Sequence, residues 1–354
     1  MRLQLIAVLL LVSRVASAQI AEQEPGKGDV KGTFAVYADD DATSVVTSIV
    51  DATVRLPVPI TINAHALVDA VSSASVDVIS AATTRFKENR IEEGAAVRAG
   101  VGQGTEASLG YTHSAENDWQ SHAVEVGVSR DLAKKNAKLS LGYGFTRNRV
   151  GRAKDPSFEA MLDIHGAQLG FAQVLDRRSL LTLAYTVSRA SGYQGSPYRY
   201  VMMAGEFAAP ETPPEERTRH AITARVLRMF GRATTLDASY RFYVDDWGVT
   251  SHTVEVAASR MITDELSVRI RARGYRQGRA DFYRESYDQP MRYMTVDREL
   301  STFWDAMGGV KLGYAGDSFD LDLKADGILY KFADYQRLAG RVALVTSLGV
   351  TWRW

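Results

Sequence analysis

The stretch "KLSLGYGFT", Lys138–Thr146, alternates strictly between apolar residues and residues that are polar or small. Leu139, Leu141, Tyr143 and Phe145 would lie on one face of a strand, because successive side chains of a strand point to opposite sides. The residues between them would lie on the other face. The pattern therefore predicts a β-strand with one apolar and one polar face.

The same alternation recurs along the chain, for example in "LSVRIRARG" (266–274), "FDLDLKADG" (319–327) and "LDASYRFYV" (236–244). The apolar faces are uniform, whereas the opposite faces combine charged residues with glycine and serine. A soluble β-sandwich would fill a core with large residues from its inner faces. This combination instead favours a closed all-β transmembrane barrel, antiparallel and up-and-down, with lipid outside and a polar interior.

About sixteen strands can be placed. They are expected at 31–39, 44–56, 59–69, 92–102, 105–115, 121–131, 137–147, 158–174, 179–190, 219–230, 234–245, 251–261, 265–276, 301–314, 319–331 and 342–354. Their connections alternate between short turns and long loops, which is typical of outer-membrane barrels with short periplasmic turns and long extracellular loops. The even number depends on the first strand, and it places both chain ends on the short-turn side.

The last strand, "LVTSLGVTWRW" (344–354), ends in an aromatic residue. Bacterial outer-membrane barrels typically end in this way, so we expect the barrel-assembly machinery to recognise the strand that ends at Trp354. Other aromatic residues on apolar faces are expected near strand ends, in girdles at the lipid headgroups. They are Tyr111, Tyr143, Tyr185, Tyr240, Tyr314 and Trp352.

The N-terminus reads as a cleavable signal peptide over residues 1–18, with Arg2, an apolar core and a small-residue site at Ala16-Ser17-Ala18. A short periplasmic segment (19–30) would precede a barrel that spans 31–354. No stretch reaches the roughly 20 apolar residues of a membrane-spanning helix. The chain has no cysteine, and its 42 basic and 42 acidic residues balance, which gives no case for nucleic acid as a partner.

A pattern occurs twice, in "DWQSHAVEVGVSRDL" (118–132) and "DWGVTSHTVEVAASRMI" (246–262). Each copy is followed by a further match, "LSLGYGFTRNRVGR" (139–152) and "LSVRIRARGYRQGR" (266–279). Duplication of about three hairpins and chance similarity between barrel strands both explain this. The Asp-Trp pairs are expected in loops at the extracellular rim, where Trp anchors the rim and Asp, Ser and His hydrogen-bond loop to barrel. These rim candidates are Asp118, Trp119, His122, Asp246, Trp247 and His252.

A catalytic role for the duplicated Ser-His pairs is not favoured. Adjacent residues of a strand point to opposite faces, so Ser121 cannot reach His122, nor Ser251 reach His252, within one pocket. None of the six histidines has a metal-ligand spacing such as H-x-x-x-H. We expect neither an enzyme nor a bound cofactor.

The strand phases predict which charged residues line the lumen. The candidates are Arg269, Arg271, Arg273, Arg241, Arg225, Arg98, Lys138, Asp237, Glu125, Glu255, Asp320 and Asp322. This lining is mixed in sign, so strong ion selectivity is not expected. The ladder Arg269, Arg271 and Arg273 would either offer bidentate donors to carboxylate or phosphate solutes or pair with acidic residues of neighbouring strands.

Several segments resemble a bacterial family known only as a domain of unknown function, numbered thirty-five seventy. They are "DAVSSASVDVIS" (69–80), "ENDWQSHAVEVGVS" (116–129), "GYQGSPYRYV" (192–201), "TRHAI" (218–222), "YRFYVDDWGVTSHTVE" (240–255) and "GYRQGRADFYRESY" (274–287). The resemblance spans nearly the whole mature chain and implies an outer-membrane β-barrel. It implies no activity and no catalytic residues.

The segments of this resemblance cluster on the long-loop side, where loops either plug the barrel mouth or form a recognition surface. The acidic run "ADDDA" (38–42), with Asp245 and Asp246, is read as a solvated loop or as a calcium site. We predict a barrel in the outer membrane of a Gram-negative bacterium, in contact with the lipid bilayer. Its expected role is a porin-like channel or transporter for small hydrophilic solutes, anionic ones included. The alternative is a closed structural or receptor barrel that binds a partner through its extracellular loops.

Overall fold

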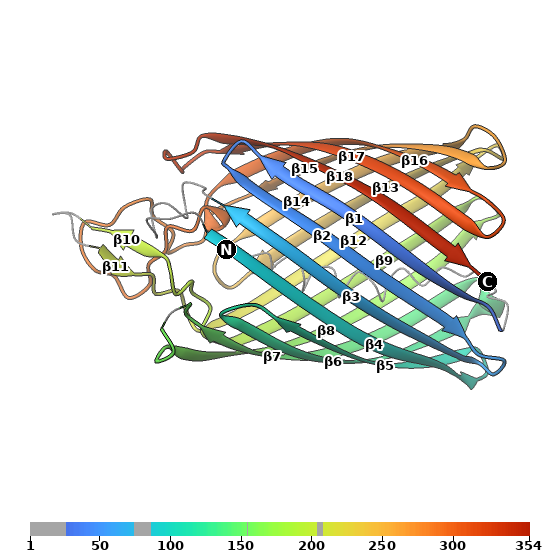
Figure 1. Ribbon diagram of the computed structural model, residues 1–354, viewed down its shortest axis with the longest axis horizontal. Coiled ribbons are helices and arrows are strands. Elements are labelled where there is room, and N and C mark those ends of the chain that lie inside the picture. Colours follow the sequence, from blue (N-terminus) through green and yellow to red (C-terminus); the bar gives the residue numbers. More distant parts are fainter. Residues whose placement is uncertain (1–25, 74–85, 154, 204–207) are drawn as a thin grey trace.

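Sixteen antiparallel strands follow one another around a closed barrel in the computed structural model of the chain (Figure 1). The structure describes residues 26–73, 86–153, 155–203 and 208–354. Two further short strands, β10 and β11, pair with each other outside the barrel. The expected all-β transmembrane architecture is confirmed.

The bounds of the strands agree with the sixteen expected ranges to within four residues, except that β4 begins six residues before the expected residue 92. They are β1 (Gly28–Asp39), β2 (Thr43–Arg55), β3 (Ile60–Ser73), β4 (Phe86–Gly102), β5 (Thr105–Ala115), β6 (Trp119–Leu132), β7 (Ala137–Gly151), β8 (Glu159–Asp176), β9 (Ser179–Gly192), β10 (Tyr200–Met202), β11 (Ala208–Pro210), β12 (Glu216–Phe230), β13 (Thr234–Asp245), β14 (Thr250–Met261), β15 (Leu266–Gln277), β16 (Phe303–Ala315), β17 (Phe319–Phe332) and β18 (Gly340–Arg353). The 3-10 turns η1 (Ala133–Lys135) and η2 (Arg298–Leu300) lie in connections. In the described part of the chain, no helix has the length and apolar character needed to cross a membrane.

The first strand closes the barrel. β1 pairs with β18 through partners such as Phe34 and Leu348, and on its other edge with β2. Sheet edges are therefore paired all the way round, which a lipid-exposed barrel requires because lipid offers no hydrogen-bond partner. β1 begins three residues earlier than expected, and the signal peptide 1–18 and most of segment 19–30 lie outside the described residues.

Short turns and long loops lie at opposite ends of the barrel (Figure 1). The short-turn end carries both the start of β1 and the C-terminus, so we assign it to the periplasm. The other end carries the connections 193–215 and 278–302, together with β10 and β11. Three of the described connections at that end are short, namely 40–42, 116–118 and 246–249.

The outer wall is apolar. Leu141, Leu323 and Ile270 are exposed, with Ile270 at 62%, although each sits in the middle of a strand. Lipid is the partner that such exposed apolar side chains need, because no other part of the chain covers them. The alternation read from the sequence therefore has the predicted sense, apolar outward and polar inward.

Tyrosine–histidine pairs repeat on the outer wall. In four hairpins, a Tyr hydroxyl lies 2.7–2.8 Å from a His Nδ1 of the next barrel strand: Tyr111–His122, Tyr143–His165, Tyr185–His220 and Tyr240–His252. Tyr111 of β5 is paired with Val124 of β6, which is paired in turn with Phe145 of β7. Phe145 lies two residues after Tyr143 in the sequence. In a barrel whose strands tilt by roughly 40°, crossing two strands at right angles to them changes the height along the barrel axis by ~6 Å. Moving two residues along the strand cancels this change. The pairs therefore lie level with one another.

Each of three descending strands carries an outward arginine eight residues after its histidine: Arg130 in β6, Arg228 in β12 and Arg260 in β14. Eight residues of tilted strand span roughly 20 Å of height. This is close to the apolar band of an outer-membrane barrel, about 25 Å tall. The duplicated segment thus has a structural meaning, since its His and Arg bracket the lipid-facing Val residues between them. Whether the two copies arose by duplication stays a prediction.

Candidate functional site in the barrel lumen

The arginine ladder on β15 is paired with acidic residues. Arg271 donates to both carboxylate oxygens of Asp326 at 2.9 and 2.7 Å, Arg273 to Asp305 at 2.6 Å, and Arg269 to Asp237 at 3.1 Å. Of the two alternatives raised by the sequence, the pairing one is therefore found.

Two of these pairs reach across an intervening strand. Arg271 lies on β15 and Asp326 on β17, with Gly309 of β16 directly opposite Asp326. A Cβ at Gly309 would collide with Asp326 Oδ1. The glycine therefore leaves room for the carboxylate to lie against the wall and meet the guanidinium.

Five of the other charged wall candidates also have partners of opposite sign on the inner face. Arg225 forms a bidentate pair with Asp237, and Glu255 lies 4.0 Å from Arg271. Nearer the periplasmic end, Asp320 accepts from Arg353 and Asp322 lies 3.6 Å from Lys31 and 3.4 Å from Lys311. Lys138 binds Glu106 at 2.9 Å in a small recess that Arg98 also lines. The described wall is polar and mixed in sign.

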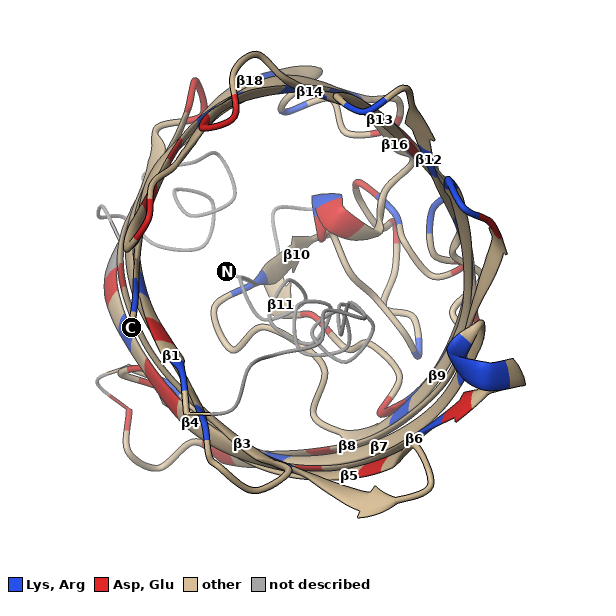
Figure 2. Cartoon of the chain, turned by 90° about the vertical axis from the view of Figure 1, so that its right-hand side faces the viewer, with Lys and Arg blue, Asp and Glu red and all other residues tan. Residues whose placement is uncertain are grey.

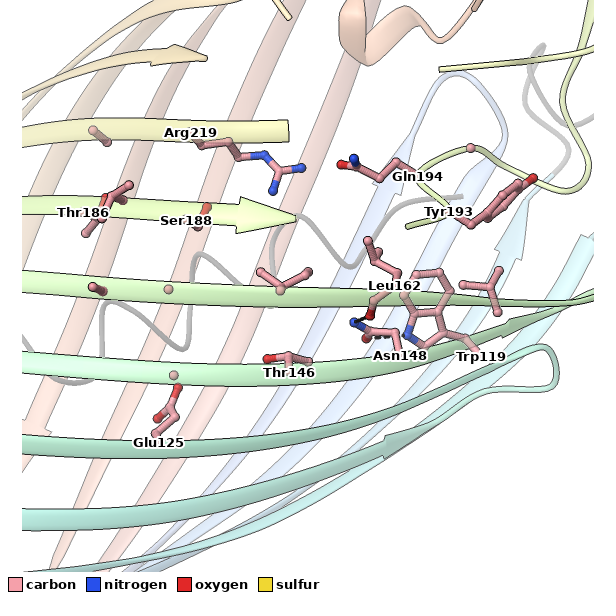
Figure 3. Close-up of a pocket in the computed structure, with 18 of the residues that line it drawn as sticks. Trp119, Glu125, Thr146, Asn148, Leu162, Thr186, Ser188, Tyr193, Gln194 and Arg219 are labelled. Carbon is pink, nitrogen blue, oxygen red and sulfur yellow. Dashed lines mark hydrogen bonds between the residues drawn. The ribbon is translucent and has the colours of Figure 1, made fainter. Parts of the chain in front are cut away.

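A cavity lies beneath an extracellular segment at the upper end of the lumen (Figure 3). Its volume is about 280 Å³, and it is enclosed by the inner faces of β6–β9, β12 and β13 and by residues 193–198. Glu125 lies on one wall, and Arg219 and Arg241 lie on another. Thr146, Thr186 and Ser188 contribute hydroxyl groups between the charges. The cavity can therefore offer donors, acceptors and both signs of charge to a small polar solute.

Hydrogen bonds fix the side chains of this cavity. Asn148 accepts from the Trp119 indole N–H at 3.1 Å and donates to the Leu162 carbonyl at 3.0 Å. Tyr198 donates its hydroxyl to Asp118 and accepts from the Ala153 N–H. Burial, together with the bond to Asp118, raises the pKa of Tyr198, so this hydroxyl stays protonated and keeps its role as a donor.

Both rim tryptophans turn inward, contrary to the expectation of rim anchors. Trp119 is the first residue of β6 and lines the cavity. Trp247 is only 3% exposed, packs against Tyr283 and Leu300 of the 278–302 connection, and donates to the Glu216 carbonyl at 2.8 Å. A buried indole of this kind anchors the loop to the barrel rather than the barrel to the membrane.

The remaining rim candidates divide between loop contacts and the outer wall. Asp118 holds Tyr198, and Asp246 accepts from the Thr218 backbone N–H at 2.9 Å, so both tie a connection to a neighbouring segment as expected. His122 and His252 instead face outward and bond to tyrosines of the adjacent strand. The two copies of the sequence pattern thus agree at the histidine and differ at the tryptophan.

The two long extracellular connections fold together into a cap. Arg199 donates to Glu211 and, at 3.0 Å, to Asp297, and both acidic side chains are 1% exposed. Thr295 also donates to Glu211, at 2.8 Å. The cap lies beyond the extracellular end of the barrel in Figure 1 and within the ring of strands in Figure 2. The long loops therefore pack over the barrel mouth.

The acidic run at 38–42 has protein partners. Asp41 binds Arg298 at 2.5 Å, Asp39 lies 3.6 Å from Arg341, and Asp245 binds Arg217. These aspartates are paired with the chain's own guanidinium groups, which differs from both the solvated loop and the calcium site considered above.

Another carboxylate group lies beside the cavity. Oxygens of Glu88, Glu116 and Asp118 lie within 4.8 Å of one another. Glu88 and Glu116 hydrogen-bond to each other, which requires a proton on one of them, and burial raises the pKa of Glu116. With Tyr198 donating to Asp118, the cluster is satisfied without a cation.

Periodicity alone did not identify the residues that complete the cavity, among them Tyr193, Gln194 and Arg219. Their positions depend on how the 193–215 connection folds back over the wall. Two of the segments that carry the family resemblance, 192–201 and 218–222, contain them. That resemblance was the available signal.

Comparison with known proteins supports the fold. The sequence model of the family described as "Protein of unknown function (DUF3570)" matches residues 83–163 and 157–339. No curated protein matches the sequence. Solved outer-membrane barrels match at high probability and low identity.

Three of these structures are informative about shape. The siderophore receptor PirA from Pseudomonas aeruginosa has a TM-score of 0.52 at 9% identity, and the match covers 92% of this chain and 62% of PirA. A bacterial polysaccharide outer membrane secretin has a TM-score of 0.55 at 9% identity, with 94% and 100% covered. CdiB from Acinetobacter baumannii has a TM-score of 0.56 at 8% identity, with 94% and 61% covered. At such identities the likeness concerns the fold, and the chain is an outer-membrane-type barrel.

Proposed function

Because the chain belongs to the DUF3570 family, whose function is unknown, we propose its role from its own geometry: a channel or transporter for small hydrophilic solutes. The solutes would enter beneath the extracellular cap and pass along the polar lumen. The observation that carries this proposal is the 280 Å³ cavity at the upper end of the lumen, which combines Glu125 with Arg219, Arg241 and several hydroxyl groups.

The charge pattern favours neutral or zwitterionic solutes over simple anions. The ladder arginines that could have bound anions are engaged by Asp237, Asp326 and Asp305. In the cavity, Glu125 and the two arginines lie on separate walls. A solute with hydroxyl groups, or with one charge of each sign, matches this arrangement best.

A hydrolytic role has little support. His122, His165, His220 and His252 bond to tyrosines of the outer wall. His65 is the histidine of the described chain that bonds to an inner-wall carboxylate, Glu92, at 3.2 Å. A serine–histidine pair would need the histidine to accept from a serine hydroxyl.

The cap supports a second candidate, a receptor or structural barrel that binds a partner. The buried Arg199–Glu211–Asp297 contacts give the cap a defined shape, and Tyr200, Met202 and Met291 lie exposed on the cap segments. A rigid surface with exposed apolar groups is suited to recognition.

A solute-flux assay separates the two candidates. Full-length chain reconstituted in phosphatidylcholine vesicles is tested for swelling in isotonic arabinose, glycine and sodium gluconate, beside a variant in which residues 194–214 are replaced by a short Gly-Ser turn. The backbone bond from Gly192 N to the Glu215 carbonyl shows that such a turn can bridge β9 and β12. We expect faster swelling of the variant, with gluconate slowest. Swelling no faster than empty vesicles for both proteins would contradict a channel and leave the receptor.

The location follows from the same proposal. The signal peptide at 1–18 would direct export, and the assembly machinery would insert the barrel into the outer membrane of a Gram-negative cell by way of the strand that ends at Trp354. The Trp354 ring lies against that of Trp352, with the ring centres 4.9 Å apart, and the Trp354 backbone exchanges hydrogen bonds with Gly28 of β1, so the terminal residue also helps to close the barrel.

A further inference from the structure

A row of arginines lies at the periplasmic edge of the apolar band. Arg130, Arg228 and Arg260 each follow a run of lipid-facing residues, and each lies on the outer face of a descending strand. Arg130 is paired with Leu139 of β7, which is paired in turn with Phe171 of β8, and the same steps lead on to β12 and β14. With a shift of two residues for every two strands, as for the tyrosines, the three arginines lie at one height along the barrel axis. They form one ring segment at the inner-leaflet headgroups.

The periplasmic turns beside this row add to its charge. Lys134 lies in η1 between β6 and β7, Arg177 lies between β8 and β9, and Arg232 lies between β12 and β13. η1 lies on the outside of the ring in the view onto this end (Figure 2). Its three residues all have positive φ, 49°, 55° and 69°, which L-residues adopt at a cost. The turn therefore has a left-handed backbone, and its residues are exposed on the outside of the barrel.

These exterior cations differ from the arginines of the lumen. Within the described residues, no carboxylate lies within salt-bridge distance of Arg130, Arg177 or Arg260, whereas Arg225, Arg271 and Arg273 on the inner wall are paired. The acidic residues nearest to the row have other contacts. Asp131 and Glu106 lie beside Lys138. Asp176 accepts from the Arg178 backbone N–H and also interacts electrostatically with Arg228, which donates to the Ser179 hydroxyl.

Exposed apolar side chains lie next to these cations on the same part of the outer wall. Leu132, Leu175, Phe230 and Ile262 are exposed between 38% and 60%. The Arg228 guanidinium lies 5.7 Å from the centre of the Phe230 ring. On the opposite side of the barrel, the same level carries Tyr314 and Trp352 instead. On one side only, the surface thus combines cations that form no salt bridge with exposed apolar side chains.

We propose that this sector, from β6 to β14, binds anionic phospholipid of the periplasmic leaflet. The guanidinium groups would hold the phosphodiester, and the exposed apolar side chains would pack against the acyl chains. Arginine suits this role because its flat donor fork matches two phosphate oxygens, and its stem lies along the apolar wall. The binding is separate from solute passage, since these side chains face away from the lumen.

Native mass spectrometry of the full chain tests the proposal. The probes are palmitoyl-oleoyl phosphatidylglycerol and palmitoyl-oleoyl phosphatidylethanolamine, titrated separately in detergent. The test variant is Arg130→Gln/Arg228→Gln/Arg260→Gln, and the matched control is Arg147→Gln/Arg149→Gln/Arg189→Gln, which removes three ion-paired outward arginines at the extracellular end. Heat-dependent mobility in SDS gels verifies that each protein is folded.

We expect the wild type to prefer phosphatidylglycerol, the test variant to lose roughly 100-fold in apparent affinity for it, and the control to match the wild type. If the triple variant fails to fold, Arg130→Gln alone should lose roughly fivefold. Equal binding of the two lipids by the wild type would overturn the proposal, as would undiminished phosphatidylglycerol binding by the folded variant. Binding of a soluble muropeptide that depends on the three arginines, without a lipid preference, would assign the sector to the cell wall and also overturn it.

Discussion

Asp245 shows how a single side chain organises the extracellular rim. Its carboxylate accepts from Arg217 Nε and Nη2 at 2.9 and 2.5 Å and from the Tyr243 hydroxyl at 2.6 Å. It also accepts from the backbone N–H groups of Trp247 and Val249. The Arg217 guanidinium in turn lies 4.2 Å from the centre of the Trp247 ring. One carboxylate thus shapes the turn that buries Trp247.

Replacing Arg217 with Gln should therefore destabilise the protein strongly. Asp245 would remain buried with its charge uncompensated, which typically costs about 3 kcal/mol. The measurement is the free energy of unfolding by urea in lipid vesicles. The control is Arg189→Gln, which removes an exposed ion pair with Glu216 one strand away and should change stability little. Equal effects of the two changes would contradict the importance assigned to burial.

Glu116 should make stability depend on pH. Burial raises the pKa of its carboxyl, so the folded state binds this proton more tightly than the unfolded state. Its contribution is then greatest below the unfolded pKa of about 4.3 and declines as pH rises toward the folded pKa. We expect Glu116→Gln to stabilise the protein at pH 7 relative to the wild type and to flatten the stability profile between pH 4 and 7. An unchanged slope in urea titrations at these pH values would show that the shift is absent.

The sequence was sufficient to predict the direction of a side chain where that direction depends on a single strand. The inward position of Arg271 follows from the alternation of β15 alone. Its pairing with Asp326 depends on Gly309 of a third strand, and no local pattern contains that arrangement. The inward turn of Trp119 and Trp247 likewise depends on contacts with distant connections.

At the scale of the strand, several strands of the outer wall carry the same spacing of polar side chains at the two edges of the apolar band. A histidine bonded to tyrosine marks the extracellular edge in β6, β8, β12 and β14. An arginine marks the periplasmic edge in three of these strands, and Gln173 occupies that position in β8. Because β12 shares the His–Arg interval without sharing the duplicated sequence, membrane geometry accounts for part of the similarity between the two copies.

A charge placed between these edges should therefore be costly. Val126 lies four residues from both His122 and Arg130 on the outer face of β6. Val126→Arg is expected to destabilise the barrel by about 2–4 kcal/mol in vesicles, because the guanidinium would enter the lipid core. Ser129→Arg, which points inward on the same strand beside Glu106, is the matched control and should be tolerated. If the two variants were equally stable, the assigned phase of β6 would be wrong.

The closing strand should be needed for assembly. The Trp354 ring lies against that of Trp352, and the Trp354 backbone pairs with that of Gly28. Trp354→Ala is expected to lower the yield of folded barrel in outer membranes several-fold, while Trp304→Ala, an exposed aromatic on β16, should leave the yield near normal. Quantifying heat-modifiable protein in isolated membranes provides the measurement. Normal assembly of the Trp354 variant would exclude a role for the terminal aromatic.

Strand boundaries were predictable because each lipid-facing strand carries its own alternating signal. The first strand, on which the even count depended, is confirmed by its pairing with β18, a contact between the two ends of the chain. The connections carried no such signal. The pairing of β10 with β11 lies within one long connection, and the contact between Thr212 and Met294 joins two of them. A strand pattern does not encode such contacts.

For the whole molecule, these elements combine into a polar conduit beneath a folded cap. The wall of the lumen holds its charges in cross-strand pairs, while the cap is fixed by buried contacts such as Arg199 with Asp297. The sequence predicted the barrel, with an apolar outer face and a polar inner face. The site beneath the cap required the three-dimensional course of the 193–215 connection.

Cysteine accessibility along β7 tests the conduit most directly, because the chain has no cysteine of its own. Single variants Ser140→Cys and Thr146→Cys place a thiol on the inner wall, and Leu139→Cys and Leu141→Cys place one on the outer wall. In reconstituted vesicles treated with a water-soluble, membrane-impermeant maleimide, we predict rapid modification at 140 and 146 and protection at 139 and 141. Protection of the inner pair, or labelling of the outer pair at the same rate, would contradict a water-filled lumen bounded by a lipid-facing wall.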